Sequence, residues 1–459
     1  MEDIELMEEK ILELLSKRRF GDLKNLLSEI NAADIAEIFA NVPERDLPVA
    51  FRILPKELAA EVFVEMDTDI QALLIEAFSD KELKEVMDEL FMDDTVDIID
   101  EMPATVARRI ISSANAETRR VINQLLTYPE DSAGSIMTTE YIDLKANTTI
   151  DAAFDRIRKI GFDTETIYSL YVTDNQRHLL GTISLKDLLL NDKSICVSQI
   201  MDENVIFANT HDDQEIVAGM FERYDMLALP VVDKENRLVG IVTVDDAIDV
   251  MQEETTEDIE KMAAILPSEH SYFKMSIFET FKSRIPWLLL LMISATFTGA
   301  IISGFEEKIK IFPALVAFIP MLMDTGGNCG SQASVTVIRA ISLGDIEFKD
   351  FFRVLWKEIR VAFLCSGTLA VVNGVKLFLV DYLWLNSFDP NVALYETFIV
   401  CATLFATVIV AKLVGCSLPI LAKKVGFDPA VMASPFITTI VDAISLLIYF
   451  AIAMSILNA

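Results

Sequence analysis

The sequence predicts a multidomain membrane protein with an N-terminal α-helical superhelix, two tandem α/β modules, an acidic connecting helix and a five-span α-helical membrane domain. Three observations support this prediction: a short repeat near the N-terminus, an uneven distribution of charge, and apolar segments long enough to cross a bilayer. Residues 1–270 contain 58 acidic and 25 basic side chains, whereas residues 271–459 contain 13 and 14. An acidic soluble half therefore precedes an almost neutral membrane half.

The acidity also limits the partners and the compartment of the soluble half. A strongly negative surface argues against nucleic acid and anionic lipid as partners and is compatible with cations, although a merely solvated acidic surface is the alternative. The five cysteines show neither zinc-site nor disulfide spacing, which suits a reducing cytoplasm. The N-terminus has no basic region leading into an apolar run, so we expect no signal peptide.

A twelve-residue repeat runs from about Ile30 to Leu126. Apolar residues recur in two series four positions apart, which are Val42, Leu54, Met66, Phe78, Leu90 and Met102, and Ile38, Ala50, Val62, Leu74, Val86 and Ile98. Each unit predicts a short amphipathic helix closed by a turn, and such helices must stack to bury their apolar faces. We therefore expect a helical superhelix over residues 1–130.

Two longer units follow, opening at Ile136 and Ile200. Each contains an apolar run, then aspartate, glycine and aspartate at matching intervals, namely Asp174, Gly181 and Asp187 in the first and Asp233, Gly240 and Asp246 in the second. The pattern predicts strand, turn, strand and helix. The pair resembles tandem CBS modules, at residues 136–199 and 200–256. That resemblance implies a regulatory role and adenine nucleotides, ATP among them, as the class of ligand.

Carboxylates crowd the stretch that joins these modules to the membrane half, residues 249–275. Helical spacings of three and four relate Asp246, Asp249, Glu253, Glu257 and Glu260. Like charges in such rows destabilise a helix slightly, and a divalent cation that bridges them to another acidic surface would remove the repulsion. An exposed acidic linker helix is the alternative.

The membrane domain, residues 282–459, contains five apolar spans at about 285–304, 312–341, 361–384, 397–421 and 430–457. The second is too long for one straight crossing, and we expect a break at Asp324–Gln332, where Gly326, Gly327 and Gly330 would bring carbonyl groups and Asn328 to a water-filled path. A cluster of packing glycines is the alternative.

The last span carries a single carboxylate, Asp442, at or near the middle of the bilayer. An ionised aspartate there is costly, by roughly 2.5–3.5 kcal/mol on insertion scales, so such groups usually face water or a cation. Helical spacing places Ser434, Thr438, Ser445 and Tyr449 on the same face. That face predicts a pore lining. The alternative is a protonated Asp442 bonded to a neighbouring helix.

Lysine and arginine predict the orientation of the spans. Nine flank one side, at 282, 284, 339, 349, 353, 357, 360, 423 and 424, against Lys308 and Lys310 on the other. The excess predicts cytoplasmic N-terminal domains and an external C-terminus in a multi-pass plasma-membrane protein. Lys376 and Lys412 fall within spans, where they can snorkel or, for Lys412, pair with an acid.

The donors along the predicted path favour a hard cation. They are carboxylate, hydroxyl, amide and carbonyl oxygens, and no histidine lies in the spans. Such ligands suit Mg²⁺ or Ca²⁺, and a single carboxylate per chain favours a Mg²⁺ ion that keeps its water shell. A second chain around a shared pore would supply a second carboxylate.

The whole chain resembles the MgtE family of magnesium channels. The matching motifs are T-G-G-N-C-G-S-Q at 325–332, E-E-T-T-E-D-I at 253–259, D-P-A at 428–430 and S-P-F-I-T-T-I-V-D at 434–442. The resemblance implies a homodimer with a central pore, a plug-like connecting helix and no enzymatic activity.

It also implies roles for particular residues. It carries the pore-aspartate role onto Asp442, which we expect to bind hydrated Mg²⁺. Their places in the glycine run and on the polar face of the last span predict that Gly326, Gly327, Asn328 and Thr438 line the path. Sensing of intracellular Mg²⁺ falls to acids of the soluble half, which we assign as Asp93, Asp97, Asp225, Asp246, Asp249, Glu257 and Asp258. Asp324 is a secondary pore group suggested by its position alone.

The mechanism that we expect is a Mg²⁺-selective pore that closes when internal Mg²⁺ bridges the acidic domains. Two alternatives remain open, a carrier of Co²⁺, Mn²⁺ or Ni²⁺ and a nucleotide-sensing adaptor whose spans serve only as an anchor. A metalloprotease is disfavoured because the sequence contains no His-Glu pair.

Overall fold

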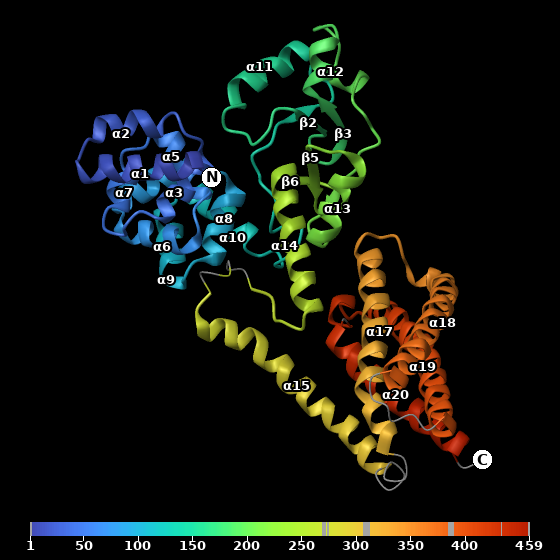
Figure 1. Cartoon of the computed structure of the whole chain (residues 1–459). Coiled ribbons are helices and arrows are strands. Elements are labelled where there is room, and N and C mark those ends of the chain that lie inside the picture. Colours follow the sequence, from blue (N-terminus) through green and yellow to red (C-terminus); the bar gives the residue numbers. More distant parts are fainter. Residues whose placement is uncertain are drawn as a thin grey trace. The chain divides into compact units, whose positions relative to one another are not determined.

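The computed structural model describes residues 2–268, 272, 275–305, 313–383, 390–432 and 434–457 (Figure 1). The chain forms two compact units, Met1–Met251 and Gln252–Ala459. Lys308 and Lys310, to which the sequence analysis assigned the external side of the membrane, lie outside the described residues.

Short helices build the N-terminal part of the first unit. They are α1 (Glu2–Ser16), α2 (Phe20–Leu27), α3 (Ala32–Ala40), α4 (Leu47–Phe51), α5 (Lys56–Val64), α6 (Thr68–Ala77), α7 (Asp80–Met87), α8 (Met92–Glu101), α9 (Ala104–Ser113) and α10 (Ala116–Leu125). Helix α3 packs on α5, α5 on α7, and α7 on α9. The predicted repeat is confirmed, since both apolar series are buried in one core apart from the partly buried Val86.

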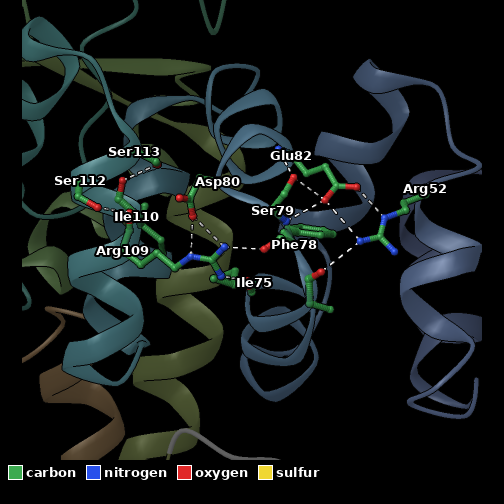
Figure 2. A network of polar contacts seen from close by, with 11 residues as sticks. Arg52, Ile75, Phe78, Ser79, Asp80, Glu82, Arg109, Ile110, Ser112 and Ser113 are labelled. Carbon is green, nitrogen blue, oxygen red and sulfur yellow. Dashed lines mark hydrogen bonds and ion pairs between the residues drawn. The ribbon is translucent and has the colours of Figure 1, made fainter.

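Two arginines, Arg52 after α4 and Arg109 on α9, bind the junction between α6 and α7 (Figure 2). Arg52 donates to the carboxylate of Glu82 at 2.7 Å and to the Ala77 carbonyl at 3.1 Å, while Ser79 and Glu82 form a capping box at the start of α7. Hydrogen bonds from Arg52 and Ser79 lower the pKa of Glu82 to about 2.

Arg109 of α9 donates hydrogen bonds to Asp80 and to the carbonyl oxygens of Ile75 and Phe78. These bonds satisfy carbonyl groups at the end of α6 that the helix itself leaves unpaired.

Two small sheets with flanking helices complete the first unit. The first consists of β1 (Asp143–Lys145), β2 (Ser169–Thr173) and β3 (Leu179–Ser184), with α11 (Ile150–Ile160) and α12 (Leu185–Leu190). The second consists of β4 (Ala208–Asn209), β5 (Ala228–Val232) and β6 (Leu238–Thr243), with α13 (Gln214–Tyr224) and the first part of α14 (Val244–Met262), which belongs to the second unit from Gln252 onward. In both sheets the middle strand pairs in parallel with the first and antiparallel with the last, with Val172 opposite Gly181 and Val231 opposite Gly240. The predicted order of strand, turn, strand and helix is confirmed.

The segments that open the two modules are exchanged between them. Thr138 bridges to Ile241 of the second sheet, and Asp202 bridges to Thr182 of the first. A Cβ atom on Gly240 would lie 2.6 Å from Met137 Sδ, and one on Gly181 would lie 2.8 Å from Met201 Sδ. Each glycine therefore leaves room for the methionine that opens the other α/β module. A module boundary drawn at residue 200 separates each of these methionines from the sheet against which it packs.

The second unit is a helical bundle. It contains α15 (Ile277–Gly304), α17 (Ile319–Ser342), α18 (Phe351–Leu383), α19 (Pro390–Val425) and α20 (Ser434–Leu457), with 3₁₀ turns at Pro313–Phe318, Phe348–Asp350 and Pro429–Met432. Within the described residues four segments are long and apolar enough to cross a membrane: Ile277–Gly304, Phe348–Leu379, Leu394–Val425 and Pro429–Ile456. Helix α17, the second predicted span, is more polar and is not among them.

The expected break in the second span is wrong, because α17 is helical throughout Asp324–Gln332. Its glycines instead permit close packing. A Cβ on Gly326 would lie 2.8 Å from Thr407 of α19, and one on Gly327 would lie 2.9 Å from Thr438 of α20. The closest approach between α17 and α19 among these glycines is at Gly415 of α19, where an added Cβ atom would lie 2.2 Å from the Gly330 carbonyl oxygen. The backbone at Gly326 and Gly327 therefore packs against protein rather than lining a path.

Substitution of Gly415 tests this packing. We expect Gly415→Ala to destabilise the bundle by about 1–3 kcal/mol, because the new methyl group meets backbone that cannot rotate away. The measurement is the thermal unfolding midpoint of the purified protein in detergent.

Gly299→Ala is the matched control, since nothing lies within 4 Å of a Cβ at that position of α15. Its midpoint should stay equal or rise slightly, as alanine favours helix. Equal loss of stability in the two variants would contradict the proposed packing role.

Candidate functional site

Asp442 lies on α20, half-buried, where α20 packs against α17 and α19. Asp324, which was expected to be a secondary pore group, lies exposed on α17, the helix that packs against α20. A half-buried carboxylate in an apolar helical bundle favours a cation or water beside it.

The polar face expected on α20 divides into two parts. Thr438 and Asp442 are half-buried, whereas Ser445 and Tyr449 are buried in protein. Ser445 donates to the Val441 carbonyl at 2.6 Å, and the Tyr449 hydroxyl donates to the Leu315 carbonyl at 2.7 Å. The expectation that these two line a path is wrong, since their hydroxyl groups are satisfied within the bundle. The side chain of Ser434 lies outside the described residues.

A polar stripe runs along the exposed face of α17. We define it as Asp324, Asn328, Gln332 and Arg339, which recur at about one or two helical turns and are all exposed in the single chain. The opposite face of α17, including Gly326 and Gly327, is buried against α19 and α20. Of the predicted lining residues, Asn328 therefore belongs to the polar stripe, whereas the two glycines bring the helices together.

A buried ion pair joins α18 to α19. The ammonium of Lys412 lies 3.8 Å from the carboxylate of Glu358, and their side chains are only 6% and 12% exposed. Lys412 was expected either to snorkel towards an interface or to pair with an acid, and the structure supports the pairing. Removing one member of such a pair would leave an uncompensated charge buried between α18 and α19.

The end of α14 is held to the bundle by charged contacts within the second unit. Lys261 bridges Glu257 at 2.5 Å and Asp428 at 2.7 Å, and Ser342 of α17 donates to Asp258 at 3.0 Å. Burial, together with the nearby charge of Asp428, raises the pKa of Asp258. Although burial opposes it, bonding to Asp428 and Glu257 raises the pKa of Lys261 to about 12. Two of the predicted sensor residues thus already lie beside one internal cation, a feature that the sequence analysis missed.

A second concentration of carboxylates lies in the first unit. We call it the acidic cluster, and it comprises Asp93, Asp94, Glu140, Glu165, Asp245 and Asp246. These residues come from the start of α8, the loops around Glu140 and Glu165, and the start of α14. Asp246 accepts from the Thr243 hydroxyl at 2.5 Å, and Glu140 accepts from the Thr138 hydroxyl at 2.6 Å. No described residue donates a hydrogen bond to the buried Oε2 of Glu165.

Burial and mutual repulsion raise the pKa values of the acidic cluster. Asp93 is 5% exposed, and burial followed by the charge of Asp246 raises its pKa well above the usual range. Burial, and then the charges of Asp94 and Asp245, raise the pKa of Glu165 to about 8. The pKa values of Asp94 and Asp246 rise to about 6, mainly through burial. Binding of either protons or a cation would stabilise carboxylates in this state, because it reduces their mutual repulsion and the cost of their burial.

The predicted sensor residues divide between these surroundings. Asp93 and Asp246 belong to the acidic cluster, and Asp249 lies one turn beyond Asp246, with its pKa raised by burial and by Asp245. Asp97 is exposed on α8, and Asp225 is exposed at the left-handed end of α13. The predicted sensor residues did not include Asp94, Glu140, Glu165 or Asp245. The adjacent pairs Asp93-Asp94 and Asp245-Asp246 were the signal available for two of these.

Among the described residues, no three carboxylate, thiol or imidazole groups form a ready-made metal site.

Comparisons with known proteins cover all parts of the chain. A model of the MgtE family, described as divalent cation transporter, matches residues 319–452, and models of the MgtE intracellular N domain and of the CBS domain match residues 30–131, and 133–193 and 197–253. "Magnesium transporter MgtE" of Thermus thermophilus is 34% identical over 99% of this chain and 100% of that protein. Its namesake from Bacillus subtilis is 33% identical over 98% of this chain and 97% of that protein.

Two solved structures are similar to the soluble half. One is a crystal structure of the soluble part of a magnesium transporter, with a TM-score of 0.52 and 31% identity over 55% of this chain and 99% of that one. The other is the cytosolic domain of the Mg²⁺ channel MgtE in complex with ATP, with a TM-score of 0.51 and 35% identity over 53% of this chain and 99% of that one.

The raised pKa values of the acidic cluster predict how stability depends on pH. Unfolded carboxyl groups ionise near pH 4, before the folded ones, so stability should fall as pH rises from about 4.5 to about 8. Mg²⁺ should restore it at pH 8. Asp93→Asn should raise the unfolding midpoint at pH 8, by about 2–4 °C for each kcal/mol of repulsion removed, and should reduce the effect of Mg²⁺.

Circular dichroism of the purified chain, followed during heating at pH 5.5 and pH 8, measures these midpoints. Asp100→Asn, which neutralises an exposed acid on the same helix, is the control and should match wild type. A midpoint that rises with pH between these values, or an Asp93→Asn variant that responds to Mg²⁺ as wild type does, would contradict the repulsion.

Proposed function

The chain belongs to the MgtE family of magnesium transporters, and from this premise we propose that it is a Mg²⁺-selective channel that imports Mg²⁺ across the plasma membrane and closes when internal Mg²⁺ is high. The observation that carries the proposal is the half-buried carboxylate of Asp442 on α20, with Asp324 exposed on α17, the helix that packs against α20. An ionised carboxylate at that depth needs a cation or water.

Asp442 is the ion site in this proposal. Thr438, one turn before it, donates its hydroxyl to the Pro435 carbonyl at 2.9 Å, which leaves hydroxyl lone pairs for water. Asn328 and Asp324 supply further oxygen atoms from the polar stripe. Oxygen donors with few carboxylates select a hard cation that retains water, which favours Mg²⁺ over Co²⁺, Mn²⁺ or Ni²⁺. Gly326 and Gly327 contribute by letting α20 approach α17.

The functional assembly in this proposal is a homodimer. The polar stripe of α17 exposes Asp324, Asn328, Gln332 and Arg339 on the single chain, and such side chains in a membrane helix face protein or water rather than lipid. A second copy that places its own stripe opposite would enclose a hydrated path and supply a second Asp442. The N-terminal domains are then cytoplasmic and the C-terminus external, in line with the lysine and arginine bias.

Gating in this proposal rests on two groups of acids. In the first unit, Mg²⁺ binds at the acidic cluster through Asp93 and Asp246, with Asp249 beside it. In the second, Glu257 and Asp258 at the end of α14 meet Asp428 around Lys261. Exposed Asp97 and Asp225 serve as outer sites that attract ions. Mg²⁺ relieves the repulsion in one conformation more than in the other, so its binding favours the closed state.

The CBS pair in this proposal binds an adenine nucleotide, ATP being the first candidate. The support is the relative of 35% identity whose cytosolic domain was solved in complex with ATP. Nucleotide binding would then adjust the Mg²⁺ concentration at which the channel closes, in keeping with a protein that is not an enzyme.

Mg²⁺ flux into proteoliposomes tests the pore. We expect Asp442→Asn to reduce flux at least about tenfold, since loss of one charge–ion contact of about 1.4 kcal/mol or more weakens ion binding by that factor. Asp324→Asn should reduce it less.

The control is Asp345→Asn, an exposed acid outside the spans of the same unit, which should conduct as wild type does. Undiminished flux in a correctly folded Asp442→Asn protein would place the path elsewhere. Absence of flux in wild type with Mg²⁺ held low at the soluble half would favour a membrane-anchored sensor.

A further inference from the structure

A small cavity opens at the end of the bundle where α17 and α19 finish. It has a volume of about 210 Å³ and is lined by Ile341, Ile346, Glu347, Phe348, Ile420, Lys423 and Lys424. Cavities for drug-sized ligands are larger, at about 300–1,000 Å³, so this one suits a small group. It lies wholly within the second unit and contains none of the groups assigned above to ion conduction or sensing.

One part of the cavity is apolar and the other is cationic. Ile341 and Ile420 are buried and belong to one core with the partly buried Ile346. Lys423 and Lys424 are exposed at the end of α19, and the Lys424 ammonium lies 3.8 Å from the centre of the Phe348 ring. A ligand with an anionic head and an apolar body would match both parts.

The acids near the cavity are already engaged. Glu347 pairs with Lys349 at 2.8 Å, and the Asp350 carboxylate accepts from the Glu347 backbone amide at 3.3 Å. Among the described residues no carboxylate forms an ion pair with Lys423 or Lys424. The cavity therefore has two lysine charges available, in contrast to the strongly acidic soluble half.

Neighbouring side chains place the cavity at the depth of lipid headgroups. Phe352, Trp356 and Phe427 are 79%, 62% and 65% exposed around this end of the bundle. Exposed aromatic residues beside lysine and arginine are typical of the boundary between hydrocarbon and water. Basic pockets between membrane helices on the cytoplasmic side bind anionic lipid headgroups.

We propose that this cavity binds the headgroup of an anionic phospholipid from the leaflet that carries the lysine and arginine excess. The lipid phosphate lies between Lys423 and Lys424, and the first part of the acyl region lies against Ile341, Ile346 and Ile420. A lipid in this position links the ends of α17 and α19.

Such a lipid would also lie next to the end of the connecting helix. Ile341 lines the cavity, and the next residue, Ser342, donates to Asp258 of α14 at 3.0 Å. The composition of the membrane would thereby influence how firmly α14 is held to the bundle.

Native mass spectrometry of the purified full chain, titrated with phosphatidylglycerol or phosphatidylcholine, tests the proposal without any transport readout. Wild type should retain phosphatidylglycerol in preference. Lys423→Ala/Lys424→Ala should weaken that binding by about 25-fold, since each lysine near an anionic lipid contributes about a fivefold factor.

The matched control is Lys282→Ala/Arg284→Ala, which removes the same charge from exposed positions at the start of α15, where Lys282 also lies over a phenylalanine ring. It should bind phosphatidylglycerol as wild type does. Equal losses in the two double variants would overturn the proposal, because they would show diffuse attraction by any basic residue.

Two further experiments distinguish binding of a lipid headgroup from binding of free phosphate. Ile346→Trp keeps both lysines but fills the cavity, and it should also weaken phosphatidylglycerol binding. Inorganic phosphate in large molar excess should leave the lipid bound. Unchanged lipid binding in Ile346→Trp, or displacement of the lipid by phosphate alone, would overturn the assignment to a lipid.

Discussion

Carboxylates placed where burial limits their contact with water are the constraint on which this structure depends. They occur in the acidic cluster, where burial and then the charge of Asp246 raise the pKa of Asp93, and in the bundle, where Asp442 is half-buried on α20 beside α17. At the end of α14 the same problem is solved internally, because the Lys261 ammonium bridges Glu257 and Asp428. The first two sites lack such a built-in cation among their assigned groups, and a hydrated Mg²⁺ ion has the charge and size to take that place.

Close packing of the helices determines how the bundle can respond to a change in charge. Gly326, Gly327 and Gly415 let α17 approach α19 and α20 so closely that a single methyl group would collide with neighbouring atoms. A bundle packed in this way has little room for small adjustments, so a change in charge at one end favours one discrete arrangement over another. The contacts of Lys261 and Ser342 place the connecting helix at the end of α17, where it can influence such a choice.

Much of the fold could be predicted from the sequence because local periodicity reports burial. The twelve-residue repeat identified the core of the N-terminal helices, and the apolar run that precedes each Asp-Gly-Asp pattern identified β2 and β5. The glycines of α17 were misread, since a packed helix and a broken one use the same residues. Glu165 and the exchanged opening segments could not be predicted, because loops far apart in the chain bring them to the acidic cluster and to the opposite sheets.

Closure by relief of repulsion is most directly tested by Mg²⁺ flux measured against the Mg²⁺ concentration on the side of the soluble half. The comparison is between wild type, Asp94→Asn/Asp246→Asn, and the control Asp69→Asn/Asp100→Asn, which neutralises two exposed acids of the same unit. The account predicts that wild type and the control close as Mg²⁺ rises, while the cluster variant needs at least about tenfold more Mg²⁺, a shift of about 1.4 kcal/mol. Closure of the cluster variant at the wild-type concentration would contradict the account.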